Sequence, residues 1–221
     1  MKNFEILDND KELNNIIDSI NDINKDSLLA CHGRYHITFV INTIEYILTE
    51  LGYDENIIEL GKIAGLLHDI GTIEGKKGHA KRSSEMCKHF LDKTELSDHD
   101  KNLIIHAIED HSNGEDINSP MGAALLIADK IDISKNRILE LGKKDSWHNN
   151  ALNIDKTFIT IENKNIVIDY IANDKFSKEI FIDEWEKGIT IPIKASKYFD
   201  CECIFKLNGN IINVNSLQKK I

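Results

Sequence analysis

The sequence predicts a mainly α protein: an all-helical region over residues 1–147, followed by a small α+β module over residues 148–221. Two observations support this prediction. Apolar residues recur at the i, i+3, i+4 and i+7 positions of a helix through roughly the first 145 residues, and alternation typical of strands begins after Trp147. Because no low-complexity linker separates the two parts, we expect them to pack together.

Turn-forming residues divide the first region into separate helices. The helix near residues 55–70 ends at Gly71, and the Gly and Lys cluster at the end of LLHDIGTIEGKKG predicts a loop. Ser119-Pro120 predicts the start of a helix, since proline is favoured in the first turn. We therefore expect helices over residues 11–23, 34–51, 55–70, 79–92, 98–111 and 120–133, with residues 134–141 continuing as a further turn or helix.

The second region combines strands and helices. Residues 157–161 and 165–171 alternate as two strands around a turn. Residues 176–187 show helical spacing, and a second helix is expected to begin at Pro192. Asn208-Gly209-Asn210 separates two further apolar segments, at residues 203–207 and 211–214, and predicts a closing hairpin because Asn-Gly is a strong turn signal.

Composition excludes several classes of protein. The formal net charge of -10 argues against a duplex nucleic-acid-binding protein, which usually presents a basic surface. No apolar run reaches membrane-spanning length and no signal peptide opens the chain, so we expect no membrane partner and a cytoplasmic location. The four cysteines form no CxxC pair, and we interpret them as ordinary buried or half-buried thiols.

Histidine and aspartate stand at apolar helical positions, where such groups are unusual. His36, His111 and Asp129 each share an apolar stripe, and His68-Asp69 follows a face of small residues. Each of them alone is readily explained as a hydrogen-bonded core residue. Together they would all need separate polar partners, whereas convergence on a metal would satisfy the whole group.

The order His36, His68-Asp69, Asp129 resembles the HD superfamily of metal-dependent phosphohydrolases, over roughly residues 27–145. AGLLHDIG looks like the core of the family motif, and LLIADKID looks like the segment with the distal aspartate. The resemblance implies an all-helical HD domain with metal at its centre, here followed by the α+β module. AIEDHSNG followed by ADKID is similar to bacterial HD proteins that hydrolyse dinucleoside tetraphosphates, although those proteins lack a comparable C-terminal module.

The resemblance further implies two divalent transition-metal ions. His79 and His111 look like the extra histidines of two-metal HD proteins. Asp69 would bridge both ions, one of which His36, His68 and Asp129 would also bind, while His79 and His111 would complete the second site. These donors suit iron, manganese, zinc, nickel or cobalt and do not choose among them.

Two ions about 3.5–4 Å apart can activate a water for phosphoryl transfer. The predicted function is hydrolysis of a phosphate ester or phosphoanhydride, with a nucleotide as the expected substrate and with catalytic roles for Asp69, His68 and Asp129. A phosphate also needs cations. The candidates next to the motifs, each of which could instead be ordinary surface charge, are Arg34, Lys76, Lys77, Arg82 and Lys130.

Two histidines compete with the proposed ligands. His106 and His111 are five residues apart, about 140° around a helix, so only one is expected to face the core; the isoleucine stripe favours His111. His32 lies four residues before His36, and either contributes to the rim of the site or is an ordinary residue near the helix start, the latter being slightly favoured. The surface is expected to hold His89, His99 and His148.

Two other functions remain open on the sequence: a di-iron HD-type oxygenase, and a non-catalytic sensor that binds a nucleotide. In each case the expected ligand is small, and the protein is a possible homodimer. The intact ligand set argues against the sensor, because a binding module need not keep all six residues.

Overall fold

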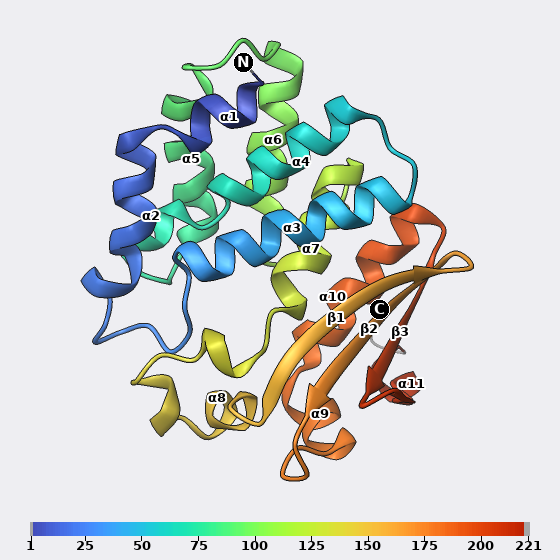
Figure 1. Ribbon diagram of the computed structural model, residues 1–221. Coiled ribbons are helices and arrows are strands. Elements are labelled where there is room, and N and C mark those ends of the chain that lie inside the picture. Colours follow the sequence, from blue (N-terminus) through green and yellow to red (C-terminus); the bar gives the residue numbers. More distant parts are fainter. Residues whose placement is uncertain (1, 219–221) are drawn as a thin grey trace.

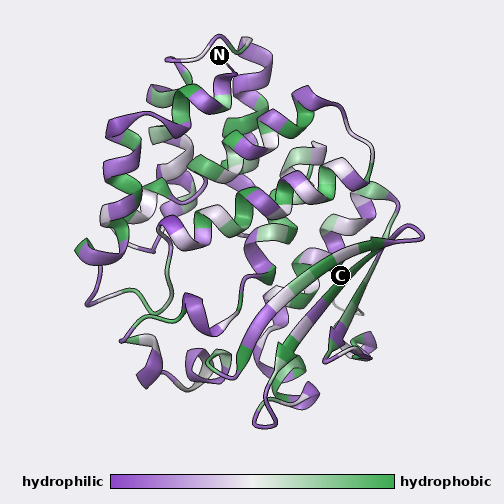
Figure 2. Ribbon diagram, viewed as in Figure 1, coloured by the Kyte–Doolittle hydropathy of each residue, from purple (hydrophilic) through white to green (hydrophobic). Residues whose placement is uncertain are grey.

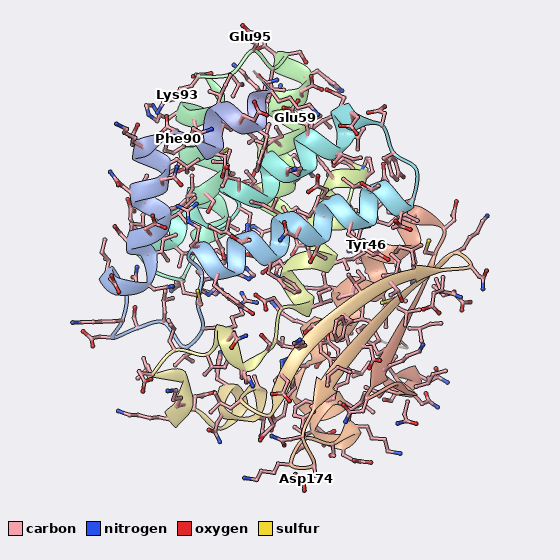
Figure 3. All side chains as sticks on the ribbon, in the orientation of Figure 1. Tyr46, Glu59, Phe90, Lys93, Glu95 and Asp174 are labelled. Atoms are coloured by element: carbon pink, nitrogen blue, oxygen red, sulfur yellow. The ribbon has the colours of Figure 1, made fainter. Side chains whose placement is uncertain are left out.

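The computed structural model describes residues 2–218, apart from the side chains of Ser146, Trp147 and Gln218. The outer limits of the two predicted regions, residues 1 and 221, lie outside the described residues. A helical region and a small four-stranded sheet lie at opposite ends of the molecule: Glu95 marks the helical end and Asp174, just after the second strand, marks the sheet end (Figure 3). The predicted mainly α fold is confirmed.

The predicted helices form, and most begin at a capping side chain. Asp10, Asp54, Ser97 and Ser119 each accept a hydrogen bond from a backbone amide in the first turn of the helix that follows. Colouring by hydropathy shows that polar and apolar residues alternate in bands along these helices (Figure 2). The helices of this region are α1 (Asn3–Asp8), α2 (Lys11–Ile23), α3 (Arg34–Glu50), α4 (Glu55–Leu67), α5 (His79–Leu91), α6 (Asp98–Asp110) and α7 (Pro120–Ile131). Helix α8 (Ser146–Ala151) spans the boundary and leads into the C-terminal part.

One connection differs from the sequence-based expectation and one agrees with it. The segment after His68-Asp69 is a short 3-10 helix, Ile70–Glu74, before the loop of residues 75–78. After α7 the chain forms the expected further turn, the 3-10 segment Lys135–Arg137, and Ile138 then pairs with Ala30 in an isolated bridge. This pairing ties the segment before α3 to the segment after α7, so the chain cannot continue as a helix there.

Helix α3 lies at the centre of the helical region, against α4 and α7 (Figure 1). The small residues of α4 permit this close approach. A Cβ atom at Gly61 would lie 2.7 Å from a methyl carbon of Ile44, and one at Gly65 would lie 2.9 Å from the same side chain. A larger side chain at either glycine would therefore push α3 away from α4.

The C-terminal sheet has the order β1-β2-β3-β4. Strands β1 (Ile154–Glu162) and β2 (Asn165–Ala172) form the predicted antiparallel hairpin. Strand β3 (Glu202–Leu207) pairs with β2 in parallel, because two helices connect them. The predicted closing hairpin is shorter than expected, since β4 covers only Asn210–Ile211, and a short helix, α11 (Asn215–Gln218), follows.

The two connecting helices divide the chain differently from the prediction. The single helix expected over 176–187 is α9 (Lys178–Glu184), and α10 (Glu186–Ser196) follows directly after Trp185. The expectation that a helix begins at Pro192 is wrong, because this proline lies inside α10. Its neighbours Ile191 and Ile193 are buried, so packing holds the helix despite the hydrogen bond that proline cannot donate.

Helix α10 joins the sheet to the helical region. It packs against α7, and a Cβ atom at Gly188 would lie 3.3 Å from the backbone oxygen of Lys130. One continuous apolar core includes residues of both regions, among them Ile127 in α7 and Ile189 in α10. The expected packing of the two parts is confirmed, and it places the start of α10 beside Asp129. Within residues 2–218, no helix is both long and apolar enough to cross a membrane.

Candidate metal centre

Five helices bring the predicted ligands to one buried point. They lie in the first turn of α3, at the end of α4, at the start of α5, at the end of α6 and in the last turn of α7. Helix ends approach one another here, so short side chains suffice to meet. The structure brings together all six, which are His36, His68, Asp69, His79, His111 and Asp129, and every one is buried.

The two carboxylate oxygens of Asp69 face two different pairs of histidines. Oδ2 lies 3.3 Å from Nε2 of His68 and 3.6 Å from Nε2 of His36. Oδ1 lies 3.2 Å from Nε2 of His79 and 3.6 Å from Nε2 of His111. This carboxylate therefore occupies the middle of the cluster, with one oxygen directed to each half.

Asp129 completes the first half. Its Oδ1 lies 3.2 Å from Nε2 of His36, which is itself 3.3 Å from Nε2 of His68. In the second half, the Nε2 atoms of His79 and His111 are 3.1 Å apart. In both halves, imidazole nitrogens face each other at a distance typical of ligands that share an ion.

Each of these histidines is held through its other nitrogen. Nδ1 of His68 lies 2.8 Å from the backbone oxygen of Gly65, and Nδ1 of His79 lies 2.8 Å from that of Lys76. Nδ1 of His111 lies 2.6 Å from the backbone oxygen of Ile108. Since a carbonyl oxygen only accepts, Nδ1 must donate and Nε2 keeps its lone pair. His36 differs, because its Nδ1 lies 2.7 Å from Oδ2 of Asp132. Hydrogen bonds of this kind orient metal-binding histidines.

The donor chemistry fits a transition metal. Three sets of three buried residues each place their donor atoms within 4.8 Å of one another. Each of His36, His68 and Asp69 belongs to two of these sets. Nitrogen and carboxylate donors without thiolate suit iron, manganese, zinc, nickel or cobalt. A buried cluster of this kind could hold a metal, which would also satisfy lone pairs that otherwise face each other.

Asp69 and His111 favour the protonation states that a metal requires, whereas His68 does not. Burial alone would raise the pKa of Asp69, but His68 and His32 hold it well below its usual range. Burial lowers the pKa of His111 to about 4. Burial also disfavours a charged His68, but the adjacent Asp69 carboxylate raises its pKa above the usual value. Near neutral pH the aspartate is therefore ionised and His111 neutral, while His68 must release any proton when a metal binds.

His32 lies inside the cluster, and the slightly favoured interpretation as an ordinary residue is not what the structure shows. Its Nδ1 is 2.6 Å from Oδ2 of Asp69, and its Nε2 is 2.8 Å from Nζ of Lys76. The side chain is buried beside His36 and Asp69. Its position four residues before His36 was the available signal, although His32 itself precedes α3, so helical spacing does not determine where its side chain points.

Two further residues were missed by reasoning from the sequence. Nη2 of Arg137 lies 3.3 Å from Nε2 of His36 and 3.6 Å from Oδ1 of Asp129. Nη1 of the same side chain donates to the backbone oxygen of Asp132. Asp132 supports His36, as described above. Asp132 had a signal, since it lies three residues after Asp129, whereas Arg137 follows the end of the helix and had none.

The five predicted substrate-binding cations separate into two groups. Nζ of Lys76 contacts His32, and that of Lys130 contacts Asp129, so both lie at the cluster. The structure does not bring the other three there. Arg34 pairs with Asp18, the exposed Lys77 is absent from the pocket beside the cluster, and Arg82 donates to three backbone oxygens of the loop before α5.

The remaining histidines are mostly at the surface, as expected. His106 lies 3.0 Å from the exposed Asp116, His89 lies 2.9 Å from Glu12, and His99 is exposed. His148 is the exception, because it lines a pocket of about 1020 Å³ beside the cluster.

Comparison with known proteins finds one family model that matches much of the helical region. Residues 34–138 match the family model of the HD domain, and this segment contains all six predicted ligands. Over these residues the chain is similar to the HD domain. Among solved structures, it is similar to a predicted HD superfamily hydrolase from an uncultured Thermotogales bacterium, with 20% sequence identity over 61% of this chain and 80% of the other, and a TM-score of 0.45. No curated protein matches the chain.

The carboxylate of Asp132 provides a prediction about ligand support. Asp132→Ala should weaken metal binding by roughly 10- to 100-fold, because His36 loses the group that orients it. Asp132→Asn should restore much of the affinity, since its amide oxygen can still accept from Nδ1. Competition with a chromogenic chelator measures both affinities. Equal affinity for the wild type and Asp132→Ala would show that His36 needs no such support.

Proposed function

We propose that this protein is a metal-dependent phosphohydrolase that cleaves a phosphate ester or phosphoanhydride with water, and that its substrate is a small phosphorylated molecule, with nucleotides as the first candidates. The observation that supports the proposal most strongly is the position of Asp69. One of its oxygens faces His36 and His68, and the other faces His79 and His111. This arrangement suits a carboxylate that bridges two ions.

The residues that would hold the ions are the six predicted ligands, with His36, His68 and Asp129 on one side of Asp69 and His79 and His111 on the other. Two such ions lower the pKa of a water molecule and neutralise charge on the phosphoryl oxygens. No side-chain nucleophile is then required. All four cysteines are buried, and within the described part of the chain none belongs to a group of potential metal ligands.

Cations around the cluster support an anionic substrate. Lys76, Lys130 and Arg137 each contact a residue of the cluster, and all three line the adjacent pocket. We name these three residues the cationic group. They would hold the phosphoryl oxygens and oppose the charge that develops on them. A di-iron oxygenase acting on an uncharged substrate would have no use for this group, so hydrolysis of a phosphate is the better supported function.

The experiment is an assay of the full chain after removal of metal and reconstitution with manganese, iron, cobalt, nickel or zinc. The substrates are nucleoside mono-, di- and triphosphates, dinucleoside polyphosphates and simple phosphate esters, and the readouts are released phosphate and nucleotide products. We expect metal-dependent hydrolysis of at least one class and its loss on chelation. Oxygen uptake in the iron-loaded protein without phosphate release would contradict the proposal and support the oxygenase.

A further inference from the structure

The pocket beside the cluster is built by both regions of the chain. The helical region contributes the cationic group and the segments around residues 27–30 and 133–138. The C-terminal part contributes His148 and Ala151 from α8 and residues 184–188 from the junction of α9 and α10. Gly188 lies against the backbone of Lys130, so this junction is fixed beside the cluster by direct packing.

Charge is distributed unevenly over this pocket. The cationic group is tied to the cluster by its contacts with His32, His36 and Asp129. The rest of the lining holds charges of both signs, with Lys81 and Lys187 set against Glu109, Glu184 and Glu186. The outer lining therefore offers no net positive charge to a second phosphate, and its carboxylates would repel one.

Apolar side chains supply much of the remaining lining. Most of them come from the two segments that the Ala30–Ile138 bridge holds together and from the C-terminal part. A volume of about 1020 Å³ is at the upper end of the range for small-molecule pockets and far exceeds the needs of a phosphate alone. The apolar residues are Leu28, Leu29, Ala30, Ala80, Ile133, Ile138, Ala151 and Trp185.

We infer that the pocket takes a molecule with one phosphate group and an apolar or aromatic organic part, rather than a polyphosphate. The phosphate lies against the cationic group, and the organic part contacts the apolar lining that the C-terminal region helps to form. This inference rests on the proposed function and narrows it: the preferred substrate is a phosphate monoester of an apolar or aromatic alcohol or nucleoside. The C-terminal region then sets the choice of substrate without supplying a ligand to the cluster.

Phosphonates test this inference, because their P–C bond is not hydrolysed and binding can be measured apart from turnover. Isothermal titration calorimetry on the metal-reconstituted full chain would compare phenylphosphonate, methylphosphonate and tripolyphosphate. We expect phenylphosphonate to bind at least about 10-fold more tightly than methylphosphonate, because its ring buries apolar surface. Tripolyphosphate should bind no more tightly than phenylphosphonate.

Matched variants test whether the apolar lining causes the preference for phenylphosphonate over methylphosphonate. Ile138→Ala and Leu29→Ala remove apolar lining from partly buried positions and should reduce the phenyl preference several-fold, whereas affinity for methylphosphonate should change little. Ile105→Ala is the control, because Ile105 is also partly buried but does not line the pocket, and it should keep the full preference.

Equal binding of the two phosphonates, tighter binding of tripolyphosphate, or an unchanged preference in both lining variants would overturn the inference. Hydrolysis of phosphate esters without any phenyl preference would overturn it while leaving the proposed function intact. A phenyl preference that depends on Ile138, in a protein that hydrolyses no phosphate ester, would support the binding site and contradict the proposed function.

Discussion

Replacing Asp69 with alanine is expected to abolish hydrolysis and most metal binding. The Asp69 carboxylate contacts both halves of the cluster, so its loss removes a ligand from each half at once. We expect kcat to fall by roughly four orders of magnitude, on the scale seen when a central catalytic group is removed. Steady-state hydrolysis of the best substrate and elemental analysis of the same sample measure the two effects.

Asp69→Asn is the second variant for this prediction. It keeps the shape of the side chain but removes the negative charge that faces the surrounding histidines. A loss of activity in this variant is therefore not caused by the cavity that alanine would leave. Circular dichroism and thermal unfolding confirm that each variant is folded. A folded Asp69→Asn protein that keeps both full metal content and full activity would show that this residue is only a structural part of the core.

The second large effect is expected at His111, compared with His106 on the same helix. His111 is buried in the cluster, where its Nε2 lies 3.1 Å from that of His79. His106 contacts the exposed Asp116 instead. His111→Ala should therefore lose at least one equivalent of metal and reduce kcat by about 10²-fold or more, whereas His106→Ala should retain both metal content and activity.

The two alanine variants are prepared in parallel, and their metal content and initial rates are measured. The comparison shows which of the two histidines belongs to the cluster. Both substitutions remove an imidazole from α6 or its end, which makes His106→Ala a close control for non-specific effects. Equal losses in the two variants would contradict the assignment of His111 to the cluster and of His106 to the surface.

The residues of the buried cluster could be located from the sequence because helical periodicity determines which side of a helix a residue faces. His36, His111 and Asp129 lie on apolar stripes, and a polar group on such a stripe must point into the core. Capping residues such as Ser97 and Ser119 set where the helices begin, which made the positions of these stripes predictable.

Residues outside the helices were not predictable in the same way. Arg137 follows a short turn after α7, and its position depends on the pairing of its neighbour Ile138 with Ala30, more than a hundred residues earlier. Arg82 was predicted to bind substrate, but its side chain instead donates hydrogen bonds to the backbone of the segment before α5. Long cationic side chains reach several partners, so nearness to a motif in the sequence does not determine which partner they take.

The C-terminal region shows a similar limit. Alternation predicted the strands, but the parallel pairing of β2 with β3 depends on how α10 packs on α7, which is a tertiary contact. That same contact brings residues 184–188 to the pocket beside the cluster. The contribution of this region to the site therefore follows from packing between regions and has no local sequence signal.

The most direct test of the account is the number of metal ions bound by the full chain. Protein stripped of metal, reconstituted with manganese or iron and separated from unbound ions should contain close to two equivalents by elemental analysis, and His79→Ala should contain close to one. The account predicts this difference because His79 belongs only to the half of the cluster that faces Oδ1 of Asp69. A value of one or less in the wild-type protein after full reconstitution would contradict the dinuclear centre on which the proposed function rests.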